Sequence, residues 1–342
     1  MKKVVLFLLI IGIIGGFIAY RTYGDIYQAN VQLNNDQVLV TINQGDNWDE
    51  VKSILAPYLK DSAALEMVKS LKDYSGNVRP GKYKLENGMS TNALVNMLRA
   101  GNQEPVQLVL NSCRTFPELA GMMGKQMQAD SLAFLRALQN DSIRMHFGFD
   151  KNTYFSMFLP NTYEIYWTKE PEEVMERMAE EFKKFWNAER LAKAKNLNLS
   201  QSEIVTIASI TQEEQLGHPE EWKTIAGLYL NRVRRKMALE SDPTIKFAVG
   251  DFSMNRVLNK HKEESKNSLY NTYHHAGIPP GPIRMPDIRA VDAVLNAEKH
   301  NYIFMCAKKD FSGFHHFSST LKEHNLHAKA YRAELDKRRI YN

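Results

Sequence analysis

The stretch that decides the fold is "IVTIASITQEEQLGHP", Ile204–Pro219. Just before it, Ser200 and Glu203 form a capping-box pattern, which predicts the start of a helix. Apolar side chains then occupy most sides of that helix, so we expect it to be buried at the centre of a domain. Gly217 and Pro219 predict its end.

The end of this helix carries two adjacent acids, Glu213 and Glu214. Glu214 shares a face with Ile207 and Ile210, so its carboxylate leaves the helix beside apolar side chains. Desolvation and the negative end of the helix dipole both disfavour the ionised form there. The pattern therefore predicts a raised pKa for Glu214 and a role as general acid near neutral pH. The alternative is that both glutamates are exposed at a frayed helix end.

The chain begins with two cationic residues, Lys2 and Lys3, followed by an uncharged run from Val4 to Tyr20. A run of about 17 residues is at the short end of what crosses a bilayer. The cationic end favours the cytoplasm, which places the rest of the chain outside. The run is longer than the apolar part of a signal peptide, and no small-x-small cleavage site follows it. We expect a single retained membrane span within residues 1–24.

Charge and cysteine usage exclude several classes of partner. The net charge is +5, and without Lys2, Lys3 and Arg21 the remaining 41 basic and 39 acidic residues leave only +2. A nearly neutral body with no basic stripe argues against nucleic acid, and no GxxxxGKS loop indicates a nucleotide. The two cysteines, Cys113 and Cys306, are far apart. We therefore expect no cofactor and no metal.

Hydrophobic patterning divides the rest of the chain into three parts. Strand-like "QVLVTI" and "PVQLVL" alternate with helical segments in residues 25–111, which predicts a small α+β module. Residues 112–199 are mostly helical, and residues 200–342 hold the motif-rich core. That core ends in a hairpin, "YIFMCA" and "HHFSST", before a polar helix. The predicted fold class is α+β: a transmembrane helix, the small module, then a mixed α/β domain with a central buried helix and a C-terminal hairpin.

Five motifs follow one another in the core: "ASITQEEQ", "AGLYLNRV", "LESDPT", "YNTYHHAGIPPGPI" and "HHFSSTLKEHN". The aromatic and amide side chains beside a stiff Pro/Gly backbone suit a carbohydrate. In this order the motifs resemble the endolytic murein transglycosylases of the YceG-like family, and the resemblance extends over nearly the whole chain. It implies cleavage of MurNAc–GlcNAc bonds in nascent peptidoglycan strands, leaving 1,6-anhydro-MurNAc ends. It also implies a LysM-like module in residues 25–111 and a location at the bacterial inner membrane, with the catalytic part outside.

The resemblance places the catalytic glutamate on Glu214, while the family's earlier glutamate is Gln212 here. In the "YNTY" motif it assigns substrate contacts to Asn271 and Tyr273. Three features depart from the usual pattern. Lys236 stands where a glycine is common, "LPNTY" carries Asn161 for a usual aspartate, and "NSCRT" replaces a turn of another type. The last two are expected to alter how the middle region seats against the cleft.

The "SDPT" motif supplies two more candidates for substrate binding, Ser241 and Asp242. Asp242 either orients the substrate or stabilises an oxocarbenium ion, or it only forms an Asx-Pro turn. His315 and His324 belong to the C-terminal motif, and their role is either chemical or structural. His324 and His327 are three residues apart on an expected helix, but no third metal ligand has supporting spacing.

One acid is enough for the implied chemistry. A glycoside hydrolase needs two carboxylates about 5–5.5 Å or 6.5–9.5 Å apart, whereas a lytic transglycosylase uses the C6 hydroxyl of the sugar in place of water. Glu203 lies roughly 16 Å from Glu214 along the helix axis, so Asp242 is the nearest second candidate. Two alternatives stay open: an inverting glycosidase that uses Glu214 and Asp242, and a non-catalytic peptidoglycan-binding scaffold that recruits wall-synthesis enzymes.

Overall fold

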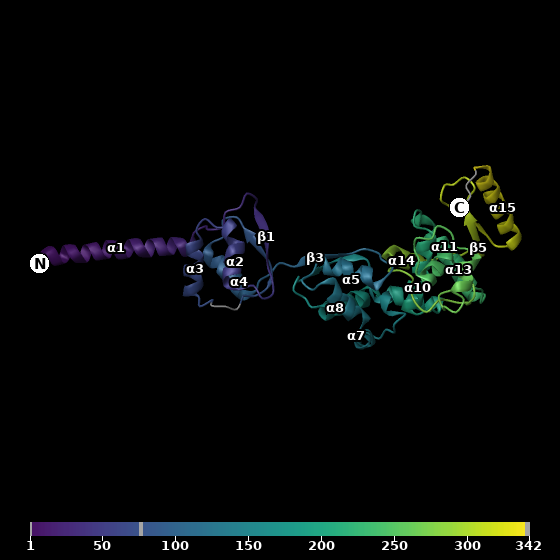
Figure 1. Ribbon diagram of the computed structural model, residues 1–342, viewed down its shortest axis with the longest axis horizontal. Helices are drawn as coiled ribbons and strands as arrows, with labels where there is room; N and C mark the ends of the chain where they lie inside the picture. The colour runs from purple at the N-terminus through teal and green to yellow at the C-terminus, as the bar shows by residue number, and fades with distance from the viewer. Residues whose placement is uncertain (1, 75–77, 339–342) are drawn as a thin grey trace. The chain divides into compact units, whose positions relative to one another are not determined.

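The computed structural model describes residues 2–74 and 78–338, which pack as two compact units (Figure 1). The first unit holds the chain up to Leu108 together with Gln126–Ala129 and Tyr163–Glu170. The second holds Val109–Lys125, Asp130–Thr162 and the chain from Pro171 onward. The two units interleave along the chain, and the division into segments 1–24, 25–111, 112–199 and 200–342 stays a prediction.

The first unit confirms a small α+β arrangement after the N-terminal helix. Strands β1 and β2 pair antiparallel with Val40 opposite Tyr83, and both of these side chains are buried in the core below the sheet. Asn47 closes a capping box at the start of α2, and Gly101 ends α4 with φ 71°. The elements in chain order are α1 Lys2–Tyr27, β1 Gln37–Ile42, α2 Trp48–Leu55, the 3₁₀ helix η1 Ala56–Tyr58, α3 Ser62–Leu71, β2 Gly81–Glu86, α4 Thr91–Ala100 and β3 Val106–Leu110.

Helix α1 has no buried side chain and a mean hydropathy of 2.4 over its most apolar window. Among the described residues it is the one helix long and apolar enough to cross a bilayer, as the N-terminal pattern predicts. It continues past the apolar run to Tyr27 and contacts α3 and α4. The small module therefore packs directly on the end of this helix.

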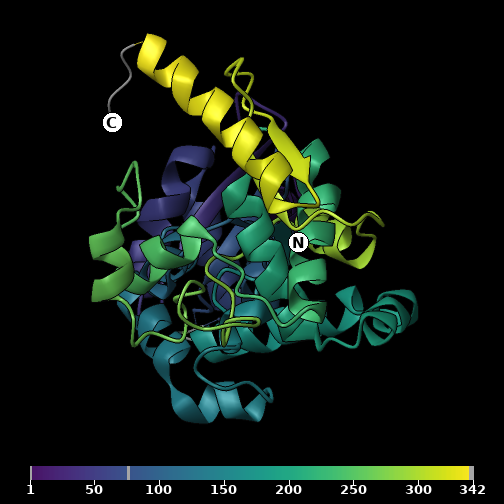
Figure 2. The ribbon, with the colours of Figure 1, turned by 90° about the vertical axis from the view of Figure 1, so that its right-hand side faces the viewer.

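The second unit is mostly helical. Strands β5 and β6 form the predicted C-terminal hairpin, with Cys306 opposite His316, and α15 packs along it (Figure 2). Strands β3 and β4 pair with each other, and each has residues in both units. The elements are α5 Phe116–Gly124, α6 Ser131–Gln139, α7 Asp141–His146, η2 Tyr154–Met157, β4 Asn161–Ile165, α8 Pro171–Phe185, α9 Ala188–Leu197, α10 Gln201–Glu214, η3 Pro219–Glu221, α11 Trp222–Arg234, α12 Asp242–Val249, α13 Asn259–Glu264, α14 Ile288–Leu295, β5 Phe304–Ala307, β6 His315–Ser318 and α15 Leu321–Lys337.

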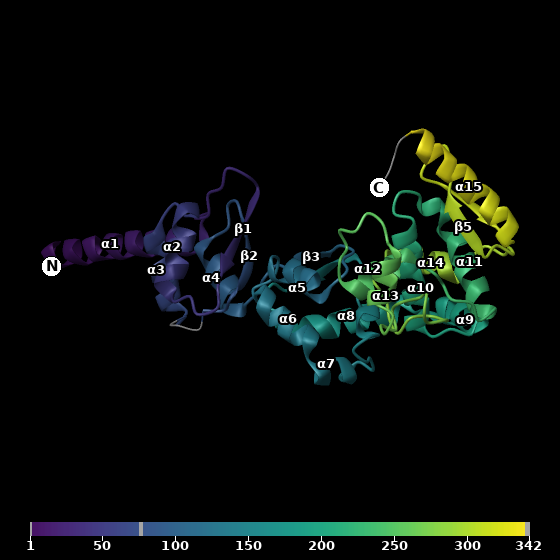
Figure 3. The ribbon, with the colours of Figure 1, turned by 45° about the vertical axis from the view of Figure 1, so that its right-hand side comes forward.

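Helix α10 lies at the centre of the second unit, as its apolar pattern predicts, in contact with α9, α11, α12 and α14 (Figure 3). Every residue from Ile204 to Gln212 is buried. The capping box is present: Ser200 Oγ accepts the Glu203 N–H at 3.2 Å, and a Glu203 carboxylate oxygen accepts the Ser200 N–H at 2.8 Å. The helix start was therefore predictable from local sequence.

The helix ends at Glu214, earlier than Gly217 and Pro219 suggest. Gln215 leaves the helical conformation, with φ −138° and ψ 85°, and its side-chain oxygen accepts the N–H groups of Gly217 and His218, each at 3.1 Å. The indole of Trp222 donates to the Gln215 carbonyl at 2.7 Å. These bonds fix the chain direction immediately after the two acids, so the carboxylates sit on an ordered helix end.

Candidate active site

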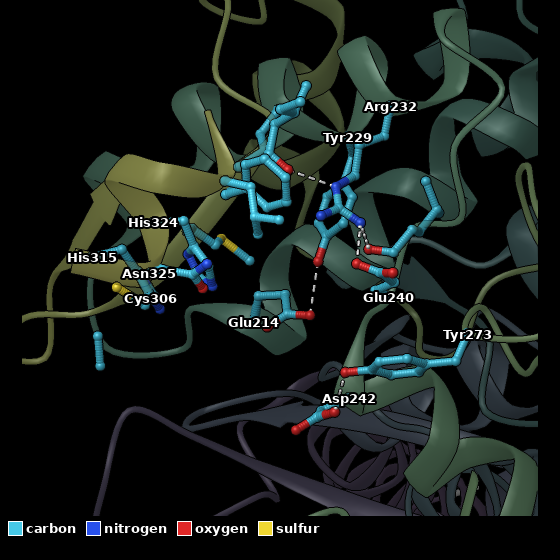
Figure 4. A pocket seen from close by; sticks show the side chains of 17 residues that line it. Glu214, Tyr229, Arg232, Glu240, Asp242, Tyr273, Cys306, His315, His324 and Asn325 are labelled. Atoms are coloured by element: carbon cyan, nitrogen blue, oxygen red, sulfur yellow. Dashed lines mark hydrogen bonds and ion pairs between the residues drawn. The ribbon is translucent and has the colours of Figure 1, made fainter. Parts of the chain in front are cut away.

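A cleft of about 460 Å³ opens at the end of α10 (Figure 4). One part of its lining comes from α10, α11 and the segment leading into α12, and it includes Glu214, Tyr229 and Asp242. The other part comes from the hairpin and the first turn of α15, and it includes His315 and His324. Side chains far apart in the sequence thus meet around one glutamate.

The carboxyl of Glu214 is held by two hydroxyl groups. Tyr229 donates to Oε1 at 2.8 Å, and Ser241 Oγ donates to the same oxygen at 2.5 Å. Burial raises the pKa of Glu214 and the negative charge of Asp242 adds to the rise, while these two hydrogen bonds oppose it. The direction of this pKa shift agrees with the sequence-based prediction.

Both hydrogen bonds that the described residues make to this carboxyl fall on Oε1. A neutral carboxylic acid carries its proton on one oxygen, and an oxygen that accepts two hydroxyl protons is the poorer place for it. The proton of Glu214 therefore belongs on Oε2. In its neutral form this carboxyl therefore has its O–H on the oxygen away from the two hydroxyls.

Ser241 and Asp242, the two candidate residues of the "SDPT" motif, have different positions relative to Glu214. Ser241 is fully buried, and its backbone N–H donates to Thr272 Oγ1 at 3.0 Å, which orients the hydroxyl toward Glu214. Asp242 lines the cleft, and its Oδ1 accepts from the Tyr273 hydroxyl at 2.7 Å. Ser241 therefore supports the carboxyl, whereas Asp242 faces the space where a ligand would lie.

Tyr273 and Asn271 play different parts although they are two residues apart. Tyr273 lines the cleft, and burial raises its pKa, so it remains a phenol that donates to Asp242. Asn271 is fully buried, and among the described residues its side chain bonds only to α13 and to the chain nearby. It donates to the Lys262 carbonyl and Ser265 Oγ, and it accepts from the N–H groups of Tyr273 and His274. Its geometry is that of a residue that positions Tyr273, not of one that touches a ligand.

Glu213 occupies a separate pocket behind the cleft. Arg114 donates Nε to Oε1 at 2.6 Å and Nη2 to Oε2 at 3.0 Å, and Arg284 donates to Oε1 at 2.9 Å. The side chains of Glu213 and Arg284 are 11% and 9% exposed, so this ion pair is largely out of water. The structure therefore excludes a frayed helix end. Neither arginine was among the residues that the sequence indicated.

The unusual "NSCRT" segment builds this rear pocket. It supplies Arg114, and Ser112 Oγ accepts from Arg284 Nη2 at 2.6 Å. The backbone carbonyl of Cys113 accepts the Met285 N–H at 2.8 Å. The segment is thus held against the end of α10 by the ion pair between Arg114 and Glu213. Within the described part of the chain, the Asn161 side chain bonds only to the adjacent Thr162 N–H. Lys236 adopts φ 56°, a conformation that favours glycine.

The hairpin contributes two histidines to the cleft. His315 contacts a buried carboxylate, Glu221, through Nδ1 at 2.8 Å. His324 stacks on Phe304 with ring centroids 5.3 Å apart, and its buried Nδ1 has no hydrogen-bond partner among the described residues. Burial lowers the pKa of His324. Within the described part of the chain, no three His, Cys, Asp or Glu side chains are grouped so as to hold a metal.

Comparisons with known proteins agree with one another. The model of the YceG-like family matches residues 40–330. The chain is 26% identical over 315 residues to the endolytic murein transglycosylase of Bacillus subtilis (strain 168), covering 86% of this chain and 84% of that protein. It is also 26% identical over 324 residues to a Streptococcus pneumoniae serotype 2 protein of the same name, of which it spans 58%.

A solved structure supports the fold. The crystal structure of a yceG-like protein from Listeria monocytogenes superposes with a TM-score of 0.56 at 23% identity. The match covers 85% of this chain and 98% of the Listeria chain. At this level of identity the similarity establishes a shared fold.

Proposed function

This chain belongs to the YceG-like family, and we propose that it is a membrane-anchored endolytic murein transglycosylase. In this proposal it is a lyase that cleaves MurNAc–GlcNAc bonds within nascent glycan strands and forms 1,6-anhydro-MurNAc ends. The observation that carries the proposal is the carboxyl of Glu214, which lines the cleft and has two hydroxyl groups on one oxygen. Such a group suits proton transfer to a sugar oxygen.

The first step is donation. Glu214 gives its proton from Oε2 to the glycosidic oxygen, the bond from that oxygen to C1 of MurNAc breaks, and the leaving GlcNAc takes the proton. Positive charge then develops at C1. The carboxylate of Asp242 lines the same cleft and stabilises that charge, while Tyr273 holds Asp242 in place.

The second step returns the proton. O6 of MurNAc attacks C1, and its proton passes to the Glu214 carboxylate, so the anhydro ring closes and the acid is restored. Tyr229 and Ser241 stabilise the carboxylate between the two steps, because hydrogen bonds from both hydroxyls favour its charged form. Water is not consumed, which is why one acid serves as both donor and acceptor.

Helix α1 supports the location that we propose. We propose that Lys2 and Lys3 lie on the cytoplasmic side of a single span and that the remaining chain lies outside the bacterial inner membrane, where peptidoglycan is built. The α+β module of the first unit is proposed to be LysM-like and to grip glycan. Wall-synthesis enzymes are the protein partners that this location favours.

The test is a digestion with full-length protein in detergent micelles and purified, uncrosslinked glycan strands, read by mass spectrometry. Wild type is expected to release fragments with anhydro ends, and Glu214→Gln to release none. Glu220→Gln, the same change at an exposed position outside the cleft, is the matched control and is expected to cut like wild type. Reducing ends formed with water would favour the inverting glycosidase, and binding without any fragments would favour the scaffold.

A further inference from the structure

The carboxylate of Glu221 sits behind the hairpin wall of the cleft and receives three N–H groups. Gln215 Nε2 donates to Oε2 at 2.9 Å, the His315 backbone N–H donates to Oε1 at 2.9 Å, and His315 Nδ1 lies 2.8 Å from Oε2. Glu221 is buried, and His315 is only 15% exposed. Glu221 therefore fixes the orientation of the His315 imidazole through the ring and the backbone of that residue.

These contacts decide which ring nitrogen of His315 carries the proton. The orientation of the Gln215 amide is set, because its oxygen accepts from Gly217 and His218 and its nitrogen must then face Glu221. A carboxylate only accepts hydrogen bonds, so the nitrogen that lies against it, Nδ1, is the N–H of the neutral ring. Nε2 is left with a free lone pair.

No hydrogen bond between described residues falls on His315 Nε2, and His315 lines the cleft together with Glu214 (Figure 4). His315 is also close enough to Glu214 for the two side chains to interact electrostatically. Besides His315, the titratable and charged side chains lining this cleft are Glu214, Tyr229, Arg232, Glu240, Asp242, Tyr273, Cys306 and His324. The one polar function that His315 offers to an occupant of the cleft is therefore an acceptor.

We propose that His315 is a substrate-binding residue: its Nε2 accepts a hydrogen bond from a hydroxyl or acetamido N–H of the bound glycan, and Glu221 holds it in the tautomer that this requires. The inference rests on the proposed function in one respect, that the occupant of the cleft is a glycan. The proposal adds a hydrogen-bond acceptor on the hairpin side of the cleft, opposite the residues of the "SDPT" and "YNTY" motifs.

The variant that isolates this role is His315→Asn. The asparagine amide reaches as far as Nδ1, so its N–H still bonds to Glu221, but nothing replaces Nε2. A merely structural role survives this change, whereas a binding role is lost. His316→Asn is the matched control, because adjacent strand residues face opposite sides and His316 stacks on His327, away from the cleft lining.

Binding is measured with full-length protein in micelles, in the Glu214→Gln background, with uncrosslinked strands of alternating GlcNAc and MurNAc as the probe. The expected result is a Kd about tenfold weaker for His315→Asn and unchanged for His316→Asn, since one hydrogen bond is lost. With Glu214 restored, KM rises by a similar factor while kcat stays within about twofold, as for uniform binding. An unchanged Kd and KM would overturn the proposal.

The tautomer is read independently of any glycan by nitrogen NMR of protein labelled at histidine, with His315→Asn identifying the signal. The neutral ring of wild type should show Nδ1–H and a bare Nε2. Glu221→Gln should weaken this preference, because an amide can accept hydrogen bonds at only one of the two positions where the carboxylate accepts them. A wild-type Nε2–H signal would overturn the inference.

The two proposals fail separately. If wild type makes no anhydro ends yet His315→Asn weakens glycan binding, the enzyme function falls and the role of His315 stands. If wild type cuts while His315→Asn binds and cuts as well as wild type, only the role of His315 falls.

Discussion

The two sides of the last turn of α10 carry the same side chain in opposite surroundings. On the rear side, the carboxylate of Glu213 is bonded by two guanidinium groups. On the cleft side, Glu214 meets only hydroxyls, and burial raises its pKa. Guanidinium groups pair with the charge of a carboxylate, whereas a hydroxyl can bond to a carboxyl in either form. One glutamate therefore anchors the helix end and its neighbour is available for proton transfer.

The largest expected effect separates the two sides by activity. Glu214→Gln should lower the rate of anhydro-product formation by about 10³-fold, in the range that general acid–base catalysis supplies. Glu213→Gln should keep activity within about tenfold per folded molecule, because its carboxylate faces away from the cleft. The measurement is product release by mass spectrometry, normalised to folded protein by circular dichroism. Equal losses in the two variants would contradict the division of roles.

For stability we expect the opposite order, with Glu213→Gln more destabilising than Glu214→Gln. Glu213→Gln leaves Arg284 largely buried without a counter-charge. We expect a loss of about 2–3 kcal/mol in the free energy of unfolding, below the range for a fully buried pair because Arg114 is partly exposed. Urea unfolding monitored by tryptophan fluorescence measures it. A larger loss of stability in Glu214→Gln than in Glu213→Gln would contradict the conclusion that Glu213 anchors the helix end.

A third experiment sharpens the comparison through pH. In the mechanism that we propose, Glu214 must be protonated to begin the reaction, so activity should be present below its pKa and fall as pH rises through it. The Ser241 hydrogen bond lowers that pKa, so Ser241→Ala should raise it and move the alkaline limb of kcat/KM to higher pH.

Ser112→Ala is the control for this profile. It removes a hydroxyl of the same kind that bonds to Arg284 in the rear pocket. The alkaline limb should stay where it is in wild type, because Ser112 contributes nothing to the pKa of Glu214. If both variants move the alkaline limb of kcat/KM by the same amount, the shift comes from a general destabilisation of the end of α10 and not from the lost hydrogen bond to Glu214.

The smallest effect concerns the stability of the cleft side itself. Because the folded-state pKa of Glu214 is raised above its ordinary value of 4.5, the folded protein holds this proton over a pH range where the unfolded chain has lost it. Stability therefore falls as pH rises through that window. Glu214→Gln removes the effect, so its Tm should exceed that of wild type by a few degrees at pH 8 and converge with it near pH 4. Parallel Tm curves would argue against the raised pKa.

Local sequence was enough for the features that depend on neighbours in the chain. The capping box at Ser200 and the apolar faces of α10 predict its start, its burial and the direction of the pKa shift of Glu214. The β5–β6 hairpin follows from its two apolar runs around a polar turn. These predictions rest on spacings of a few residues, which a single sequence displays directly.

The partners of each acid were harder to predict because they come from far along the chain. Arg114 lies 99 residues before Glu213, and Arg284 lies 71 residues after it. Tyr229 stood inside the quoted motif "AGLYLNRV", but helical periodicity marks it as a core residue and is silent on its hydroxyl. The signal for Glu213 was the acid itself: a carboxylate at the end of a buried helix requires a cation from somewhere.

Helix α1 also sets a length. It runs without interruption from Lys2 to Tyr27 and packs on α3 and α4, so only the seven helical residues after Tyr20 separate the apolar run from its end. At 1.5 Å per residue this is about 10 Å. In the membrane-anchored form that we propose, α1 is a rigid spacer that holds the first unit at a fixed, short distance from the bilayer surface. The first unit then reaches only glycan within that distance.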